Sequence, residues 1–315
     1  METASAPRSA DRPVALTGAT GFIGGRFLAR MARAGFPVRA LTRRPPPDGP
    51  PGVEWVAGDL AGPAALTRLV RGARAVVHCA GAVRGASRAA FDRVNREGAA
   101  RVARTAAEAG AADRFLNLSS LAARHPELSW YAASKRRGEE AVEGELPAGI
   151  RVASFRPTAV YGPGDREMRA FFRLLRRGVL LAPGPRGTRL TLLHVDDLVE
   201  AMVAWISAAE PPAGVFELHD GAPEGYGWTD LAEAARDTWG VRVRTVRPPE
   251  PFLAAAARAN LVLARVVGRA PMLTPGKVRE IRHPDWRCRN DALTEALGWV
   301  PSVRLRDALR EGRTS

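Results

Sequence analysis

A tyrosine and a lysine four residues apart are the side chains of this sequence best suited to chemistry. They stand in Tyr131-Ala-Ala-Ser-Lys135, eleven residues after the pair Ser119-Ser120. On a helix, residues i and i+4 share one face, so Tyr131 and Lys135 are expected to lie side by side. Because the chain holds only three tyrosines and two lysines, chance explains this spacing poorly.

This arrangement suits proton transfer at a secondary alcohol or a ketone. A hydride that moves to or from a nicotinamide must be matched by a proton at the substrate oxygen. Free tyrosine titrates near pH ~10, too high for a base at neutral pH. A Lys135 ammonium and an oxidised nicotinamide would favour the Tyr131 phenolate and bring its pKa nearer the working pH. Ser120 is expected to hold the substrate oxygen, and Ser119 to face the cofactor or pack. The alternative is a Tyr/Lys pair on a helix surface.

A glycine-rich turn near the start of the chain is expected to hold the cofactor. Val14–Leu16 is a short apolar run, Gly18, Gly21 and Gly24 follow at three-residue spacing, and apolar residues then recur with helical period. Strand, glycine turn and helix form the arrangement that binds a dinucleotide. Bare glycines let the backbone approach the pyrophosphate, and the helix N-terminus attracts its charge.

The end of the second predicted strand, 37–41, indicates which dinucleotide binds. An acidic residue at this point holds the ribose 2′-hydroxyl of NAD, whereas an arginine accommodates the 2′-phosphate of NADP. Here Thr42 takes the place of the acid and is followed by Arg43 and Arg44. We therefore expect NADP as the cofactor, with NAD as the second choice. The alternative is that the two arginines are solvated turn residues.

Further motifs resemble the short-chain dehydrogenase/reductase superfamily, in its extended epimerase/dehydratase branch. The glycine turn has its spacing, Thr17-Gly-x-x-Gly-x-x-Gly24. The stretches Arg156–Gly164, His194–Leu198 and Leu297–Pro301 are similar to its Arg-Pro-x-x-Val-Tyr-Gly-Pro, His-Val-Asp-Asp-Leu and Leu-Gly-Trp-x-Pro signatures. The resemblance runs from about residue 14 to 310. It implies an α/β fold, a Rossmann-type doubly wound parallel sheet with a smaller C-terminal substrate lobe, and Ser120, Tyr131 and Lys135 as the catalytic residues.

The glycine motif and the resemblance together assign the cofactor-binding residues. Gly58-Asp59-Leu60 resembles the segment that covers the adenine ring, although Asp59 is equally well explained as a helix N-cap before Pro63. The stretch that begins at Arg156 resembles the segment that lies along the nicotinamide. The predicted set is Thr17, Gly18, Thr20, Gly21, Phe22, Ile23, Thr42, Arg43, Arg44, Asp59, Leu60, Cys79, Ala80, Gly81, Tyr131, Lys135, Pro157 and Val160.

Other polar residues are expected to have structural roles. Asn95, on a helix predicted over 88–109, is expected to steady the strand that carries Ser120. Asp196 or Asp197 is expected to cap the helix that follows, and His194 to pack. Cys79 is expected to be a buried small hydrophobe rather than a nucleophile. Two cysteines without metal-ligand spacing predict no disulfide framework and no metal site.

The predicted organisation is one domain after a short tail. Residues 1–12 are expected to be disordered, and 13–315 to form a single domain. Its nucleotide-binding core is expected over about 13–165 and 190–220, and its substrate lobe over about 166–189 and 221–315.

The substrate class follows from two departures from the resembled family. Sugar-nucleotide members usually place an arginine four residues before His194, where this chain has Leu190; Arg189 is one residue earlier, and one step along a strand reverses the side-chain face. Dehydratases usually carry Asp-Glu where Leu121 and Ala122 stand. We expect a less polar hydroxy or carbonyl compound, as in the 3β-hydroxysteroid dehydrogenase and dihydroflavonol reductase-like groups. The alternatives are a nucleotide-sugar epimerase or reductase, and a non-catalytic NADP-binding sensor or assembly subunit.

The charge of the chain bears on its partners and location. The formal net charge is +14, almost all of it from arginine. No basic run is interleaved with aromatic residues, so nucleic acid is not expected as a partner. An amphipathic helix over 253–268, with Arg258, Arg265 and Arg269 on one face, either rests on a membrane through 252–269 or packs with its arginines snorkelled. A cytoplasmic monomer or homodimer is expected.

Overall fold

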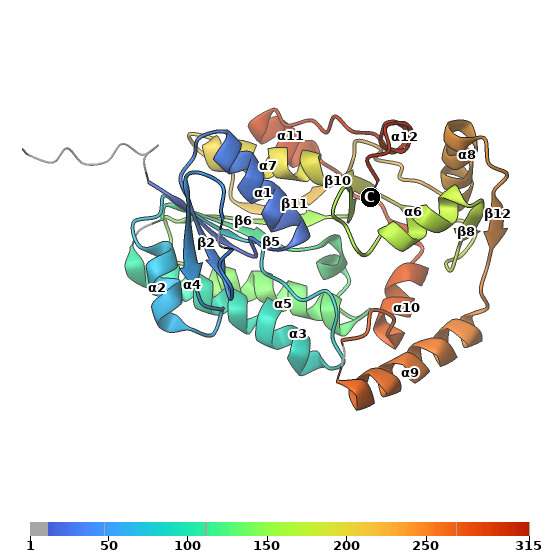
Figure 1. Cartoon of the computed structure of the whole chain (residues 1–315), viewed down its shortest axis with the longest axis horizontal. Helices are drawn as coiled ribbons and strands as arrows, with labels where there is room; N and C mark the ends of the chain where they lie inside the picture. The colour runs from blue at the N-terminus through green and yellow to red at the C-terminus, as the bar shows by residue number, and fades with distance from the viewer. Residues whose placement is uncertain (1–11, 47, 111, 269, 315) are drawn as a thin grey trace, which may run out of the picture.

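The computed structural model describes residues 12–46, 48–110, 112–268 and 270–314, and it has an α/β architecture (Figure 1). All but the last residue of the predicted disordered tail, 1–12, lies outside the described residues. The α/β class predicted from the sequence is confirmed, and the molecule has a central sheet with helices on both faces.

The central sheet has seven parallel strands in the order β11-β6-β5-β4-β1-β2-β3. Strand order therefore reverses between β1 and β4, and in sheets of this kind ligands bind in the crevice at that point, beyond the carboxyl ends of the strands. Every strand-end motif of the sequence meets at this edge. The strands are β1 (Val14–Thr17), β2 (Val38–Thr42), β3 (Val53–Ala57), β4 (Ala75–His78), β5 (Arg114–Leu118), β6 (Arg151–Pro157) and β11 (Gly214–Leu218).

Each face of the sheet is covered by its own apolar core. On one face α1 (Phe22–Arg33) and α7 (Val195–Ser207) pack together over the strands, with Trp205 among the largest fully buried side chains. On the other face lie α2 (Pro63–Val70), α4 (Glu97–Ala109) and α5 (Trp130–Glu145) (Figure 1). These helices bury leucine, valine and alanine side chains against the sheet. Strands β1 and β4 are buried along their whole length, as central strands of a parallel sheet must be.

A smaller lobe is built beside the carboxyl edge of the sheet (Figure 1). A third apolar core holds its helices together. The lobe contains α6 (Arg169–Arg176), α8 (Trp228–Trp239), α12 (Leu305–Arg310), β8 (Val179–Leu181) and β12 (Arg244–Val246). Short parallel pairs, β7 (Ala159–Tyr161) with β10 (Leu192–His194) and β9 (Arg189–Leu190) with β13 (Asp285–Trp286), connect it to the core. On the sheet side, α11 (Asp291–Leu297) precedes the final segment.

Two further helices lie below this lobe in Figure 1. The long helix α9 (Glu250–Val267) runs along the outer edge of the molecule, and α10 (Pro275–Arg282) lies between it and the sheet domain. Among the described residues, no helix is both long and apolar enough to cross a bilayer.

The structure corrects two local predictions. The helix predicted over 88–109 is two helices, α3 (Arg88–Asn95) and α4, separated at Arg96, where the Asn95 side chain turns away to bond other segments. The helix cap predicted at Asp196 or Asp197 is His194, whose ring accepts a hydrogen bond from the Asp196 N–H. Asp197 instead accepts bonds from Ser302 and Val303, so it anchors the C-terminal segment.

Candidate active site

The glycine turn brings three backbone segments into close contact. Gly18 has φ +74°, and a Cβ atom added to it would lie 2.6 Å from the Ala80 nitrogen. A Cβ atom on Gly24 would lie 2.2 Å from the Gly18 carbonyl oxygen. Both positions therefore require glycine, because any side chain would push α1 and the segment after β4 away from the turn.

The N-terminus of α1 is suited to an anion. Its cap residue is Gly21, no side chain caps the described helix, and its first turn contains no acidic residue. Thr20 and Gly21 are exposed, and Phe22 and Ile23 are half-buried. The first backbone N–H groups are thus left for a ligand such as a pyrophosphate. This cradle fits the dinucleotide predicted from the sequence.

Thr17 lies beneath the turn rather than at its surface. It is fully buried, its hydroxyl is 2.8 Å from His78 Nδ1, and it accepts a bond of 3.3 Å from the Ala80 N–H. The hydroxyl therefore fixes the Cys79–Ala80 backbone against Gly18. Burial raises the pKa of the Cys79 thiol to about 12, so the thiol stays protonated at neutral pH. Cys79 is partly buried against the core of one sheet face, rather than fully buried as predicted.

The ends of β2 and β3 place the residues predicted for the adenosine half. Thr42 is buried and its hydroxyl accepts from the Arg44 N–H, while the Arg43 and Arg44 side chains are exposed. Asp59 is exposed, and its carboxylate accepts from the Ala61 N–H at 2.9 Å.

The alternative of Asp59 as a helix cap is wrong, since Gly62 caps α2. Leu60 packs against Gly98 of α4, where an added Cβ would come within 2.8 Å of the leucine side chain.

The structure brings Ser120, Tyr131 and Lys135 together beyond the carboxyl end of β5. Ser120 caps the short helix η2 (Leu121–Arg124) and is hydrogen-bonded with the Tyr131 phenol. Lys135 donates to the Leu118 carbonyl oxygen at 2.5 Å. A Cβ added to Gly81 would lie 3.7 Å from Lys135 Nζ, so the segment after β4 passes beside the lysine ammonium. The arrangement has the elements of a proton-transfer site facing the glycine turn.

Burial shifts the pKa values of Lys135 and Tyr131. It lowers the pKa of Lys135 to about 8 and raises the pKa of Tyr131. The hydrogen bond with Ser120 opposes the rise at Tyr131, and the charged groups that act on this phenol from another element are Glu280 and Lys277 of α10. Within the protein itself, the pKa of Tyr131 is thus raised rather than lowered, which keeps the phenol protonated as an acid.

A buried ion pair that the sequence did not predict supports this site. Ser119 donates to the Glu139 carboxylate, which also accepts two bonds from Arg156. Ser119 therefore packs into this network, and the alternative in which it faces the cofactor is wrong. Both residues stand next to motifs that the sequence indicates, since Glu139 follows Lys135 by one helical turn and Arg156 lies at the end of β6.

Asn95 has a different structural role from the predicted one. Its side chain accepts from the Ala82 N–H at 2.7 Å and donates to Ser134 at 2.8 Å. It thus joins the segment after β4 to α5, rather than steadying the strand that carries Ser120.

The segment after β6 lies over the start of α1. Pro157 is buried at the end of β6, Val160 is half-buried in β7, and an added Cβ on Gly164 would be 3.7 Å from Phe22. Tyr161 is fully buried, packs against Phe172 and His194, and burial raises the pKa of its phenol. Tyr161 is therefore a packing residue.

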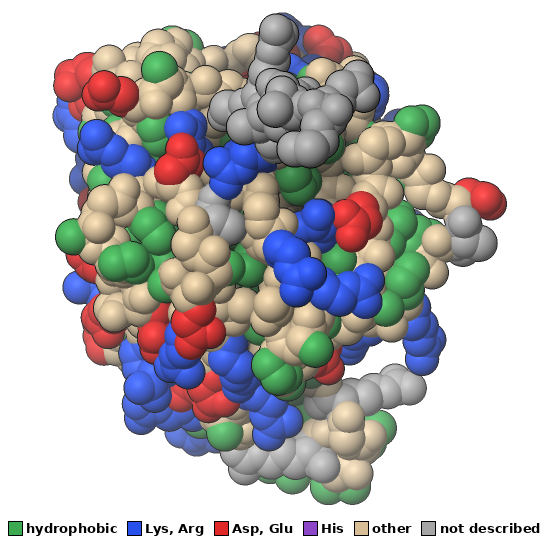
Figure 2. Space-filling model, turned by 90° about the vertical axis from the view of Figure 1, so that its left-hand side faces the viewer, with side chains coloured by type: hydrophobic (Ala, Val, Ile, Leu, Met, Phe, Trp, Pro, Cys, Tyr) green, Lys and Arg blue, Asp and Glu red, His purple; other side chains and the backbone are tan. Residues whose placement is uncertain are grey.

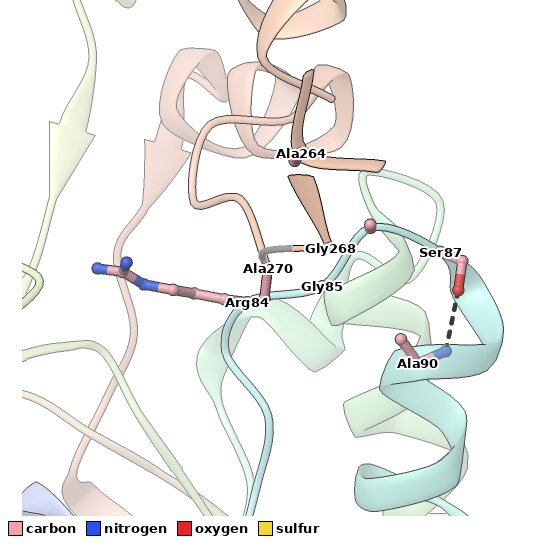
Figure 3. A pocket seen from close by; sticks show the side chains of 8 residues that line it. Arg84, Gly85, Ser87, Ala90, Ala264, Gly268 and Ala270 are labelled. Carbon is pink, nitrogen blue, oxygen red and sulfur yellow. Dashed lines mark hydrogen bonds between the residues drawn. The ribbon is translucent and has the colours of Figure 1, made fainter. Parts of the chain in front are cut away.

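An open cavity of about 430 Å³ adjoins the site, between the loop after β4 and the end of α9 (Figure 3). A Cβ on Gly85 of this loop would lie 2.9 Å from the Phe91 ring, and Phe91 packs edge-on against Tyr131 with ring centroids 6.1 Å apart. Phe91 thus separates the cavity from the tyrosine. The lining residues are mostly small: Arg84, Gly85, Ala86, Ser87, Ala90, Ala264, Gly268 and Ala270.

Charged side chains of both signs are interspersed on the face of the molecule in Figure 2. Many arginines are ion-paired, such as Arg39 with Glu54 and Arg104 with Glu145. The exposed face of α6, with Arg169, Arg173 and Arg176, agrees with the solvated alternative to an anion site. Within the described ranges, no cluster of His, Cys, Asp and Glu could hold a metal ion.

Comparison with known proteins places this chain among enzymes. Residues 14–218 match the model of the NAD dependent epimerase/dehydratase family. The chain is 38% identical over 287 residues to a ceramide reductase of Caulobacter vibrioides (strain NA1000 / CB15N), covering 90% of this chain and 88% of that protein. It is 25% identical over 337 residues to a 2-alkyl-3-oxoalkanoate reductase of Stenotrophomonas maltophilia (strain K279a), covering 96% and 98% of the two chains.

A solved structure shares the fold at low sequence identity. MoeE5, in complex with UDP-glucuronic acid and NAD, superposes with a TM-score of 0.71 at 21% identity, over 94% of this chain and 96% of that one. The superfamily, the Rossmann-type sheet and the nicotinamide dinucleotide class of cofactor predicted from the sequence are confirmed. The chain belongs to the NAD dependent epimerase/dehydratase family, and it is an NAD(P)-dependent enzyme of the oxidoreductase/epimerase type.

Proposed function

We propose that this enzyme reduces a ketone on a long-chain lipid of the ceramide class to a secondary alcohol, with NADPH preferred over NADH. The observation that carries the proposal is the convergence of Ser120, Tyr131 and Lys135 beyond β5, opposite the glycine turn. The raised pKa of Tyr131 supports reduction, because a protonated phenol is the form that can give a proton to a carbonyl oxygen.

Each residue of the site has its own role in this reaction. When bound, the nicotinamide cofactor supplies the hydride that goes to the carbonyl carbon. Ser120 orients the carbonyl oxygen through its hydroxyl, and Tyr131 gives its proton to that oxygen. Lys135, with a pKa of about 8, keeps a positive charge near the cofactor side of the site at neutral pH. Gly18 and Gly24 keep the backbone close to the pyrophosphate.

Two similarities support a lipid ketone as the substrate. The names of the ceramide reductase and of the 2-alkyl-3-oxoalkanoate reductase both describe reductases of compounds with alkyl chains. Ceramide carries a secondary alcohol, and the ketone is the compound whose reduction produces it. Both names agree with the less polar substrate expected from the sequence.

The position that would hold a nucleotide diphosphate argues against the sugar alternative. Leu190 stands where sugar-nucleotide enzymes of the resembled family place an arginine, and it is half-buried. The neighbouring Arg189 points to Asp230, with a 2.8 Å ion pair between them. Its guanidinium thus points to α8 in an exposed ion pair, and the arginine position of the sugar-nucleotide enzymes is occupied by a leucine, which disfavours a nucleotide-sugar epimerase.

The outer face of α9 supports a lipid substrate. Its exposed apolar residues recur at helical spacing, with Phe252 67%, Leu263 61% and Val266 81% exposed. Ala257, Leu261 and Ala264 face inward. We propose that this face rests on the bilayer that holds the substrate, as amphipathic interfacial helices do. Arg265 and Arg269 lie outside the described side chains, and Arg258 is exposed.

The test is a comparison of substrates under one set of conditions. A long-chain 3-oxo amide lipid in detergent micelles and a UDP-hexose are each offered with NADPH, and the loss of reduced nicotinamide is followed. We expect oxidation of NADPH with the lipid ketone, formation of the secondary alcohol, and no turnover of the UDP-hexose. Turnover of the UDP-hexose alone would overturn the substrate assignment, and nicotinamide binding without any turnover would favour the sensor alternative.

A further inference from the structure

The second lysine of the chain, Lys277, lies near Tyr131. Of 47 lysine and arginine residues, only Lys135 and Lys277 are lysines, and they are 142 residues apart in the sequence. Lys277 belongs to α10, yet its ammonium interacts electrostatically with the Tyr131 phenol. A chain that uses arginine almost everywhere therefore has one of its two compact ammonium groups near Tyr131 and carries the other one helical turn along α5. An ammonium is a point charge on a flexible stem, whereas a guanidinium is larger and planar.

Helix α10 is fixed to the start of α5 by close contacts. A Cβ added to Gly276 would lie 2.7 Å from the Cβ of Ser129, the residue that caps α5. Arg279 donates to the Leu128 carbonyl oxygen at 2.8 Å. Tyr131 is the second residue of α5, so these contacts hold the first turn of α10 next to it.

A buried carboxylate fixes the position of the Lys277 ammonium. Lys277 Nζ is 2.8 Å from Glu280, whose side chain is only 6% exposed, and Glu280 also accepts from the Ser129 hydroxyl. Ser129 in turn accepts from the Ala132 N–H at 2.9 Å. The Lys277 side chain itself keeps 32% of its surface exposed. The lysine is therefore anchored by this ion pair without being fully enclosed.

We propose that the Lys277 ammonium is a second cation of the active site, and that it stabilises the phenolate that Tyr131 becomes after giving its proton to a carbonyl oxygen. The inference rests on the proposed acid role of Tyr131. In the reduction, the carbonyl carbon gains a hydride from the reduced nicotinamide, the carbonyl oxygen gains the Tyr131 proton, and the O–H bond of Tyr131 breaks. The negative charge left on the phenol oxygen is balanced by Lys277 until water returns a proton.

Each charged group near Tyr131 and Lys277 either favours or opposes the charged form of these two side chains. On Tyr131, the Lys277 ammonium favours the phenolate, the hydrogen bond with Ser120 acts in the same direction, and Glu280 opposes it. On Lys277, Glu280, Tyr131 and Glu167 all favour the charged form. Glu167 is itself paired with Arg84 at 2.9 Å, which reduces its influence. Lys135 lies one helical turn along α5.

The chain offers a direct test, because it has three tyrosines. Burial raises the pKa of all three phenols, so the phenolate of Tyr131 is identified by the difference between the parent and a variant that lacks this phenol. Its ultraviolet absorbance can be read after rapid pH jumps, without substrate or cofactor. Tyr131→Phe removes the signal and identifies it.

Two substitutions then shift this signal in opposite directions. We expect Lys277→Met to raise the titration midpoint by about one pH unit, since a favourable charge is removed. Lys277→Arg, which keeps the charge, stays near the parent. Glu280→Gln keeps an acceptor for Ser129 but removes the opposing charge, and it lowers the midpoint. A loss of structure would not produce shifts of opposite sign.

In the pH profile for lipid ketone reduction, we expect the midpoint of the basic limb to shift in the same direction for each variant as the titration midpoint of Tyr131. We also expect a roughly tenfold lower turnover for Lys277→Met, with little change in KM. If Lys277→Met does not fold, Lys277→Gln replaces it. A Lys277→Met midpoint equal to that of the parent overturns the inference. Because the titration needs no substrate, that result is distinct from failure of the proposed reaction.

Discussion

The Glu139 carboxylate accepts two hydrogen bonds from the Arg156 guanidinium, at 2.8 and 2.5 Å, in an ion pair whose side chains are 7% and 9% exposed. The pair joins α5, one turn beyond Lys135, to strand β6. Removing one member of a buried pair leaves the other charge uncompensated. We therefore expect Glu139→Gln to lower the free energy of unfolding by about 3–5 kcal/mol, measured by urea denaturation.

The matched control is Glu140→Gln on the same helix. Glu140 pairs with Arg136 in the solvent, with side chains 57% and 47% exposed. Exposed pairs contribute little, so this change should cost less than about 1 kcal/mol. Equal losses in the two variants would contradict the structural importance of the buried pair.

Tyr131→Phe should abolish most turnover while leaving cofactor binding nearly unchanged. The substitution keeps the ring that packs against Phe91 but removes the proton. Loss of a positioned acid costs roughly 10²-fold or more in rate. Hydride transfer to the lipid ketone and calorimetric titration with the cofactor measure the two effects.

Tyr161→Phe is the control for this experiment. The Tyr161 hydroxyl is buried and makes no hydrogen bond within the described structure, so its loss should leave turnover unaffected. If Tyr131→Phe reduces the ketone at the parent rate, Tyr131 is not the acid.

Arg43→Ala should weaken NADPH binding selectively. Arg43 is exposed at the carboxyl end of β2, where a 2′-phosphate is held in related sheets, and the preceding Thr42 offers no carboxylate. Direct titration with both cofactors should give tighter NADPH binding in the parent and a smaller difference in the variant. Arg176→Ala, on the exposed face of α6, is the arginine control. Equal affinity of the parent for NADPH and NADH would contradict the predicted preference.

The stability of the fold should fall in mild acid because of His78. Burial lowers the pKa of His78 to about 3, below the unfolded value of about 6.5. The unfolded chain therefore binds a proton below pH 6.5 that the folded chain does not, and stability falls with falling pH. Between pH 6.5 and 4 this amounts to about 3 kcal/mol.

Comparison with His78→Asn isolates that contribution from those of the carboxylates. An asparagine can keep the contact with the Thr17 hydroxyl and does not titrate. Denaturant unfolding across this pH range should show a shallower loss for the variant. Parallel curves would mean that His78 accepts its proton in the folded state.

The exposed apolar face of α9 should bind anionic vesicles. Val262 and Val266 are 60% and 81% exposed on this helix, so Val262→Glu with Val266→Glu should reduce flotation with the vesicles. Val300→Glu, at a residue 67% exposed beyond α11, is the control and should leave flotation unchanged. Absence of binding by the parent at low salt would show that the helix does not rest on a membrane.

Local sequence spacing predicted the parts of the site that are formed by neighbouring residues. Gly18 and Gly24 could be identified because a tight turn between a strand and a helix imposes glycine at fixed intervals. Tyr131 and Lys135 could be identified because they share one helix face. The doubly wound parallel sheet was implied by the resemblance to the short-chain dehydrogenase/reductase superfamily, whereas the order of its strands was not predicted.

Contacts between residues far apart in the sequence could not be predicted from local spacing. Glu139 and Arg156 meet only because α5 packs across β6, and Lys277 reaches Tyr131 through a helix almost 150 residues later in the chain. The scarcity of lysine singled out Lys277, because Lys135 and Lys277 are the only lysines in a chain that otherwise uses arginine. The cap at His194 was missed because a histidine ring is an uncommon N-cap, whereas Asp196 and Asp197 have the preferred chemistry.

The scarcity of lysine also makes the active site open to selective labelling. Reagents that acylate neutral amines can modify the α-amino group, Lys135 and Lys277. Lys277 is held protonated by Glu280, which raises its pKa, whereas Lys135 has a pKa of about 8 and is partly neutral at mildly alkaline pH. A small acylating reagent should therefore mark Lys135 first among the two side chains, and bound cofactor should protect it. The labelled peptide read by mass spectrometry then reports occupancy of the active site.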